Sequence, residues 1–279
     1  MRPARQSDRA EIETFLRGRI QTSMFPLLNL LEHGWNSDAE YAMRFWVREE
    51  GGLVRDVLGL TNGGMVMPQC PTMDPADAPV ALLGQRITGF IGLADQVRPI
   101  QAALGLAETP ANLDRDEPLM ALDLAELQVP DGPGGIIPLA LAPPDVILDW
   151  MTTYEIEALQ TPREEAAEDA KGSYARYCQR GSHVALMDKG RPLAMTGFNA
   201  QLPGIVQIGG VFTPPDLRSL GYARRALALH LQQARKEGVG RSVLFSASEA
   251  AQRTYAAIGY RQIGQWTLCL LKDELVIHG

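Results

Sequence analysis

The chain of 279 residues is poor in cysteine: it contains three, Cys70, Cys178 and Cys269, and they lie far apart. Cysteines spaced in this way form no CxxC pair, so they indicate neither a disulfide framework nor a thiolate zinc site. The four histidines are scattered without HxxxH or similar spacing, and the sequence therefore predicts no metal site. A reducing, cytoplasmic environment suits this composition.

Positive charge is also scarce, because 26 Lys and Arg face 33 Asp and Glu, giving a formal net charge of -7. Nucleic acid or an anionic membrane would require a broad basic face, so neither is expected as a partner. No segment approaches the roughly 18 apolar residues of a membrane span, and the basic stretch 1–15 has no apolar run behind it. The sequence predicts a soluble protein.

The chain has no GxxxxGK[ST], GxSxG or GxGxxG motif, but it has a different anion-binding pattern at 205–225, IVQIGGVFTPPDLRSLGYARR. An apolar strand leads through a proline turn into Arg-x-x-Gly-x-Ala at the start of a helix. The amides of a first helical turn have no partner inside the helix and lie at the positive end of its dipole, so they bind anions. Gly221 lets a phosphate approach the backbone, while Arg218, Arg224 and Arg225 supply cations. The pattern predicts a pyrophosphate site.

The prolines and glycines of 129–145 deny this segment a helix or a central strand, and we place a domain boundary there. The predicted domains are 1–142 and 143–279, each with two helices followed by an antiparallel meander, which favours duplication. In the first domain the expected elements are helices at 8–20 and 24–32, strands at 41–48, 53–60, 65–69 and 86–91, a helix at 95–106 interrupted near Pro99, and a strand at 119–124. In the second they are a helix capped by Asp145, a charged helix at 162–179, strands at 183–188, 193–200 and 205–212, a helix at 221–237, a strand at 242–247, a short helix capped by Ser248, and a strand at 261–271.

The segment 205–260 resembles the GNAT acyl-CoA N-acyltransferase superfamily, because the Arg-x-x-Gly-x-Ala loop is followed at matching spacing by a second signature around a tyrosine. The matching residues are Arg218, Gly221, Ala223, Ser248, Ala251, Tyr255, Gly259 and Tyr260. The resemblance implies an α+β, mixed α/β fold of two GNAT-like domains, each a mostly antiparallel mixed sheet flanked by helices. Domain 1–142 has no comparable loop, so it resembles a degenerate GNAT-like domain, and one cofactor per chain is expected.

The resemblance also implies acetyl-CoA as co-substrate. It assigns cofactor binding to Val211, Phe212, Thr213, Arg218, Ser219, Leu220, Gly221, Tyr222, Ala223, Arg224, Ser248 and Ala251. Many relatives have asparagine where this chain has Ser248, and serine keeps a hydrogen-bonding group there. The Val211 amide would stabilise the oxyanion, and Tyr255 would protonate the departing thiolate. For Arg224 and Arg225, we expect one of the two to contact a phosphate.

Glu155 and Glu157 are candidates for the general base, and a solvated helix face is the alternative for both. Trp150 and Tyr154 are expected in the core or the wall of an acceptor pocket, and His183 is expected to be a strand residue with a satisfied ring.

The sequence thus predicts an N-acetyltransferase that acts on a primary amine of a small molecule or peptide. A non-catalytic acyl-CoA-binding or regulatory module is the alternative, and a nucleic-acid adaptor would need a basic stripe that the sequence lacks. The identity of the acceptor, and the choice between monomer and homodimer, stay open.

Overall fold

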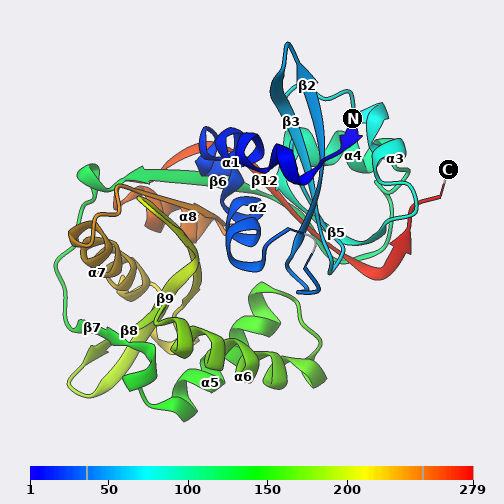
Figure 1. The fold of residues 1–279 in the computed structure, drawn as a ribbon. Helices are drawn as coiled ribbons and strands as arrows, with labels where there is room; N and C mark the ends of the chain where they lie inside the picture. Colours follow the sequence, from blue (N-terminus) through cyan, green and yellow to red (C-terminus); the bar gives the residue numbers. More distant parts are fainter. Residues whose placement is uncertain (36, 247, 279) are drawn as a thin grey trace. The chain divides into compact units, whose positions relative to one another are not determined.

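A computed structural model of the chain describes residues 1–35, 37–246 and 248–278. The chain divides into two compact units, unit 1 with Met1–Pro118 and Gly264–Gly279, and unit 2 with Leu119–Ile263. The predicted mixed α/β class is confirmed (Figure 1). The elements up to the boundary are β1 Arg2–Pro3, η1 Gln6–Asp8, α1 Arg9–Arg17, α2 Ile20–His33, β2 Met43–Glu50, β3 Leu53–Thr61, β4 Met65–Gln69, η2 Pro75–Asp77, α3 Ala78–Ala81, β5 Arg86–Leu93, α4 Ala94–Ala103 and β6 Ala111–Asp123. Those that follow are η3 Leu124–Glu126, β7 Gly135–Pro138, η4 Leu139–Leu141, α5 Pro144–Ala158, α6 Arg163–Arg180, β8 His183–Asp188, β9 Arg191–Leu202, β10 Ile205–Phe212, η5 Pro215–Leu217, α7 Tyr222–Lys236, β11 Arg241–Phe245, α8 Glu249–Ala256 and β12 Arg261–Val276.

Unit 1 is built on a sheet in the order β1-β2-β3-β4-β5-β12. The strands β2, β3 and β4 form the predicted antiparallel meander, and β5 joins β4 in parallel. The helices α1 and α2 follow each other directly and pack on the meander. A core cluster under α3 and α4 includes the fully buried Leu58, Ile87 and Phe90. The apolar faces of the strands thus hold this unit together.

Unit 2 repeats the same order, with helices α5 and α6, the antiparallel meander β8-β9-β10, and β11 parallel to β10. Successive side chains of a strand point to opposite faces, so the meander supports two cores. On one face α7 contributes Leu227 and Leu231 to a cluster with Ile208, while on the other α5 contributes Trp150 to a cluster with Phe212. The recurrence of helix, helix and meander that the sequence predicted is confirmed by these pairings.

The compact units differ from the expected domains, whose boundary was at 142/143. The strand β6 pairs with β11 through Leu119–Asp123, so the chain enters unit 2 earlier than the proline-rich segment suggested. The C-terminal strand β12 pairs with β5 from Trp266 onward and is therefore counted with unit 1. The strands β6 and β12 each begin in one unit and end in the other. The composition of the segment 129–145 cannot predict this, because it depends on which strands pair.

Several smaller expectations also need correction. The segment 129–145 contains a strand, β7, which pairs only with β8 among the described residues, and an edge position tolerates its proline. The helix α4 continues through Pro99 without interruption. Pro143 occupies the N-cap of α5, and Asp145 lies in its first turn. Ala247, the last residue of the strand expected at 242–247, lies outside the described residues.

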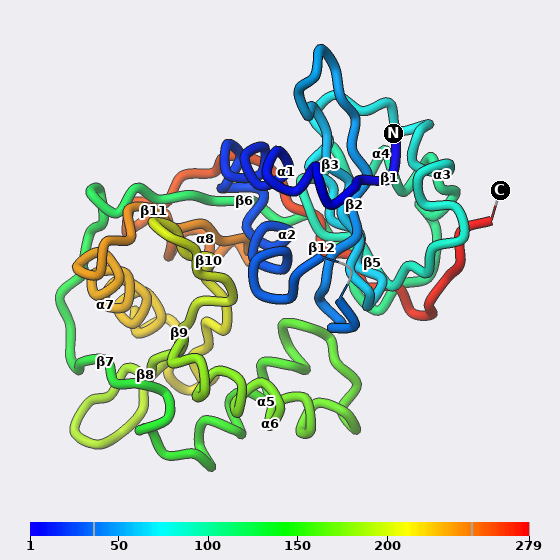
Figure 2. The backbone as a smooth tube through the Cα atoms, viewed as in Figure 1, coloured from blue at the N-terminus to red at the C-terminus, as the bar shows by residue number. Residues whose placement is uncertain are grey.

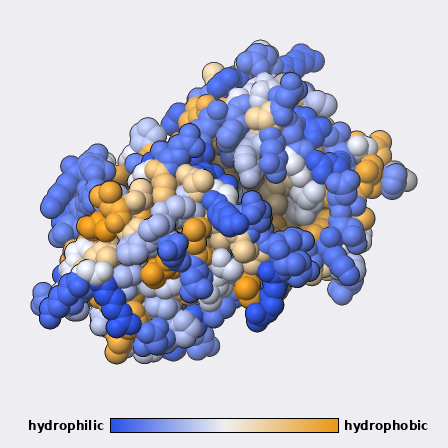
Figure 3. Space-filling view, turned by 90° about the horizontal axis from the view of Figure 1, so that it is seen from below, coloured by the Kyte–Doolittle hydropathy of each residue, from blue (hydrophilic) through white to orange (hydrophobic). Residues whose placement is uncertain are grey.

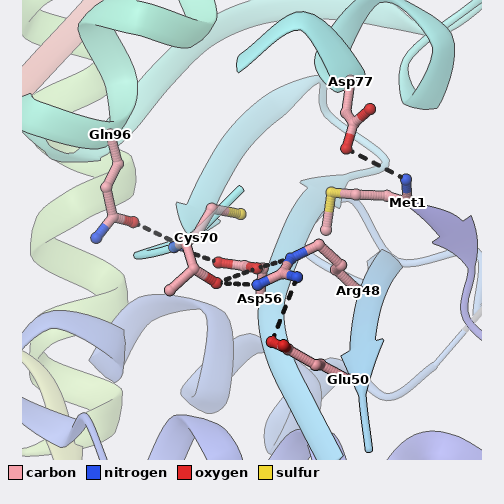
Figure 4. Close-up of polar contacts among 8 residues, drawn as sticks. Met1, Arg48, Glu50, Asp56, Cys70, Asp77 and Gln96 are labelled. Atoms are coloured by element: carbon pink, nitrogen blue, oxygen red, sulfur yellow. Dashed lines mark hydrogen bonds and ion pairs between the residues drawn. The ribbon is translucent and has the colours of Figure 1, made fainter. Parts of the chain in front are cut away.

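The loop after β4 in unit 1 is the counterpart, by strand order, of the loop between β10 and α7 in unit 2. In unit 1 this loop is hydrogen-bonded to Asp56, which is fully buried on β3 (Figure 4). Its carboxylate accepts hydrogen bonds from Arg48 Nε at 2.6 Å and from the Thr72 amide and hydroxyl at 2.7 Å each. The amide of the neighbouring Cys70 donates to Gln96 Oε1 at 2.6 Å.

The helical segment that follows this loop is short and acidic. Asp74 caps η2 by accepting from the Ala76 amide, and Asp77 lies in the first turn. The next helix, α3, has 4 residues, whereas α7 in unit 2 has 15. The Asp74 carboxylate thus accepts from the first turn of η2, whereas Gly221 leaves the first turn of α7 without a side-chain cap.

The surface of the molecule is mixed in character. In the face shown in Figure 3, hydrophobic residues form small groups separated by hydrophilic ones. Among the described residues, no helix combines the length and hydropathy that crossing a membrane requires.

We predict that Asp56→Asn lowers the free energy of unfolding by about 3 kcal/mol, because it removes a buried charge that pairs with Arg48 and orders Thr72. The measurement is urea denaturation followed by circular dichroism. Glu50→Gln is the matched control, since Glu50 reaches the same arginine at 3.8 Å but is 70% exposed. That control is expected to cost less than about 1 kcal/mol. Equal effects of the two changes would contradict this role of Asp56.

Candidate active site

The strand β10 leaves its neighbour β11 partway along its length (Figure 2). Parallel pairing joins Ile205–Gln207 to Arg241–Val243, and among the described residues no further pair follows. On its other side β10 stays paired with β9 as far as Phe212, through a bulge between Gly209 and Phe212. Among the described residues, the side of β10 that faces β11 therefore has no strand partner beyond Gln207.

The turn after β10 ends at the N-terminus of α7 with a row of unpaired amides. Gly221 is the N-cap, with φ +84° and no side-chain cap, and the first backbone bond runs from the Arg225 amide to the Gly221 carbonyl at 3.0 Å. Among the described residues, no group accepts from the amides of residues 219–224. Ser219 also has a positive φ of 64°. Such a concave run of donors at a helix start is suited to a phosphate oxygen.

Arg218 lies at this turn but is already engaged. Its Nη2 donates to Glu157 Oε2 at 2.6 Å and its Nε to the Thr213 carbonyl at 3.0 Å. The side chains of Arg218 and Glu157 are each 45% exposed. An exposed pair of this kind contributes about 1 kcal/mol or less, so an incoming anion can displace Glu157.

The other two arginines of the motif have different environments. Arg225 donates to the carbonyls of Pro130, Pro133 and Gly134 at 2.7–3.1 Å, so it fastens that segment to α7. Arg224 has a buried Nε that finds no partner in residues 1–35, 37–246 and 248–278, and its Nη2 lies 3.5 Å from where a Cβ on Gly221 would be. Arg224 is therefore the one whose guanidinium lies beside the unpaired amides.

The second signature forms α8. Ser248 is its N-cap, and the Ser248 hydroxyl accepts from the Ala251 amide at 3.4 Å, as the sequence predicted. Tyr255 is 7% exposed and lies in the cluster beneath α7, with its ring 6.0 Å from that of Tyr260. The Thr213 hydroxyl, directly after β10, is buried and has no hydrogen-bond partner in the part of the chain that the structure describes.

Glu155 and Glu157, the two candidate bases on α5, differ in burial. Glu155 is 7% exposed and accepts from the Thr161 hydroxyl at 3.0 Å. Burial raises the pKa of Glu155, with Asp169 adding to the rise, while the Thr161 bond opposes it. Glu157 is exposed and paired with Arg218. Of the two, Glu155 is the buried one with a raised pKa, the direction of shift that favours a carboxylate as proton acceptor.

Two side chains that the sequence assigned to packing lie at the bulge of β10. Burial raises the pKa of Tyr154, and the phenols of Tyr177 and Tyr255 raise it further, while the nearby Gly210 amide opposes the rise. His183 is 1% exposed; its Nδ1 lies 2.9 Å from the Ser182 hydroxyl oxygen, but Nε2 has no partner among the described residues, so only half of the expected satisfied ring is observed. Only the fold reveals these contacts, because Tyr154 and His183 belong to no local motif.

The described residues contain no group of His, Cys, Asp and Glu side chains suited to holding a metal ion. The donors at this site are instead amides, a hydroxyl and guanidinium groups. These are the groups that bind phosphates and amide-rich chains rather than cations.

Comparison with known proteins agrees with this chemistry. Residues 146–260 match the family model described as Acetyltransferase (GNAT) family. No curated protein matches the chain.

Solved structures resemble the chain along nearly all of its length. One is a GCN5-related N-acetyltransferase from Sphaerobacter thermophilus, with a TM-score of 0.61, 13% identity, and coverage of 100% of this chain and 95% of that one. Another, from Kribbella flavida, has a TM-score of 0.56, 18% identity, and coverage of 91% and 95%. A tandem GNAT protein from the clavulanic acid biosynthesis pathway has a TM-score of 0.55, 14% identity, and coverage of 100% and 98%.

At these identities the likeness to solved structures shows the fold, while the family match is local to unit 2. The chain therefore carries a domain of the acetyltransferase (GNAT) family at residues 146–260, within a fold that it shares with GNAT proteins.

Proposed function

We propose that the GNAT domain transfers an acetyl group from acetyl-CoA to a primary amine by direct attack of the amine on the thioester. The observation that carries this proposal is the run of amides at 219–224, which have no acceptor among the described residues and lie next to Arg224. A pyrophosphate placed there accepts several hydrogen bonds at the positive end of α7. The guanidinium of Arg224, and that of Arg218 once it leaves Glu157, would neutralise its charge.

The pantetheine arm would lie along the free side of β10. Val211, Phe212 and Thr213 form the end of the strand that β11 does not cover, and an amide-rich chain can pair there as an added strand would. We infer that the Thr213 hydroxyl bonds such a chain, because it is buried and lacks a partner among the described residues. Ser248 and Ala251 lie at the start of α8, which we infer forms the opposite wall.

The chain supplies groups for each charge and proton in the transfer. The amine nitrogen forms a bond to the thioester carbon while the Val211 amide stabilises the oxyanion; removing such a donor costs ~3 kcal/mol. When the carbon–sulfur bond breaks, Tyr255 gives its proton to the thiolate. The attacking nitrogen gives up a proton to Glu155, directly or through water.

We infer one acetyl-CoA per chain, because the counterpart loop in unit 1 is closed by Asp56 and capped by Asp74. We infer a cytoplasmic location from the composition, because three free cysteines suit a reducing compartment. The acceptor is a small-molecule or peptide amine. The competing proposal is a module that binds acyl-CoA without turnover.

The test of this function is a thiol-release assay with acetyl-CoA across a panel of polyamines, amino acids, aminoglycosides and peptides. Release that depends on one class of amine, with a matching acetylated product by mass spectrometry, is the expected result. Tight acetyl-CoA binding without amine-dependent release in any class would favour the binding module.

We predict that Gly221→Val weakens acetyl-CoA binding by at least about tenfold, since it adds bulk at the amides and strains a residue with φ +84°. Calorimetric titration measures the affinity and is expected to give one site per wild-type chain. Gly238→Val is the matched control, because Gly238 has φ +94° at the other end of the same helix, with nothing within 4 Å of an added Cβ. An equal loss of affinity in both variants would move the phosphate site elsewhere.

We predict that Tyr255→Phe lowers kcat about a hundredfold with little change in KM for acetyl-CoA, because the phenol acts only as sulfur leaves. Steady-state kinetics with the best amine measures both constants. Tyr174→Phe, which removes a tyrosine hydroxyl from α6, serves as the control and should leave kcat within about twofold. An unaltered kcat in the Tyr255 variant would remove this residue from the mechanism.

A further inference from the structure

The imidazole of His183 is clamped between an aromatic ring and the backbone of two strands. The Tyr177 ring stacks on it at 3.5 Å between centroids with an interplanar angle of 9°. On the other side, a Cβ on Gly197 of β9 would overlap the imidazole, and one on Gly210 of β10 would come within 2.7 Å of Nε2. The absence of side chains at these two glycines lets the imidazole lie directly against the backbone.

Gly210 is at the centre of the β10 bulge. Its φ is +60°, and the regular register of β10 with β9 is lost between Gly209 and Phe212. The Gly210 amide lies close enough to the Tyr154 hydroxyl to lower the pKa of that phenol. The residue is thus contacted from two directions, by the imidazole edge at its Cα and by a phenol at its amide.

The next peptide unit joins Gly210 to Val211, and its N–H is the oxyanion donor of the proposed reaction. A bulge bends the strand and redirects the groups beside it, so small rotations at Gly210 change where this N–H points. Glycine itself resists such rotation least of all residues. The rigidity of the donor must therefore come from the neighbours of Gly210.

Folding stability gives no reason for a histidine at this place. Its Nδ1 lies 2.9 Å from the Ser182 hydroxyl oxygen, but its buried Nε2 has no partner within the described part of the chain, and an unsatisfied buried group destabilises a protein. Burial lowers the pKa of His183 to about 3, so the ring stays neutral at ordinary pH. Its contribution is therefore the shape of a flat ring rather than a charge.

We propose that His183 and Tyr154 are positioning residues that hold the Gly210–Val211 peptide so that the Val211 amide points at the acetyl carbonyl. The inference rests on the proposed transferase function. It adds that the orientation of the oxyanion donor depends on the His183 imidazole, which stacks on Tyr177, and on the Tyr154 phenol beside the Gly210 amide.

The experiment compares His183→Ala, His183→Phe and Tyr154→Phe with the wild-type protein. His183→Ala removes the wedge, and kcat should fall about tenfold or more while KM for acetyl-CoA stays within about twofold. His183→Phe restores a flat ring without the nitrogens and should recover most of the lost kcat. Tyr154→Phe, which removes a single oxygen atom, should lower kcat in the same way even if the alanine variant folds poorly.

A spectroscopic readout separates alignment from general damage. Bound acetyl-CoA labelled with carbon-13 at the carbonyl should show a lowered C=O stretching frequency in the wild type, and His183→Ala and Tyr154→Phe should return it toward the free value. His230→Ala is the control: His230 is a buried imidazole stacked on Phe198 at 3.9 Å, and it is not among the atoms nearest to a Cβ placed on Gly209 or Gly210.

The outcomes distinguish this inference from the proposed function. A wild-type protein without turnover and without a shifted carbonyl frequency would contradict the transferase itself. An active wild type whose kcat and carbonyl frequency are unaltered in His183→Ala and Tyr154→Phe would overturn only the positioning role. Equal losses in His183→Ala and His230→Ala would also overturn it, because both would then reflect lost packing.

Discussion

The site depends on one break in strand pairing, the point after Gln207 where β10 stops bonding to β11. Had the pairing continued, the backbone of β10 would be covered and the turn into α7 would have no open space beside it. Because the strands part, the chain presents a free strand edge, a bulge and a row of unpaired amides within a few residues of one another. The roles proposed for Glu155 on α5 and Tyr255 on α8 depend on a cofactor bound along this free edge of β10.

The two units show how little of the architecture is needed to create or remove such a site. Both have two helices, an antiparallel meander and a fourth, parallel strand. In unit 2 the loop before the helix is lined with arginine and glycine, while in unit 1 Asp56 ties the loop to β3 and Asp74 satisfies the following turn. A shared fold therefore carries opposite electrostatics at equivalent loops, and function has to be argued from those loops.

The sequence predicted the parts of this structure that local patterns control. The meanders, α7 with its Gly221 start, and α8 with its Ser248 cap follow from periodicity, turn residues and capping chemistry. Tertiary contacts decided the rest. The three arginines of the motif look alike in the sequence but have different partners. Arg218 pairs with Glu157, Arg225 holds the segment at 130–134, and Arg224 lies beside the unpaired amides. No local sequence pattern predicts the pairing of β12 with β5 or the contact of His183 with Gly197 and Gly210, because each joins residues far apart in the sequence.

The most direct test of the account is amide hydrogen exchange, resolved by residue, with and without coenzyme A. The account predicts that the cofactor protects the amides of residues 219–224 more than any others in the chain, because they exchange freely until a pyrophosphate accepts from them. Tight binding of coenzyme A that leaves those amides exchanging at their original rates would contradict it.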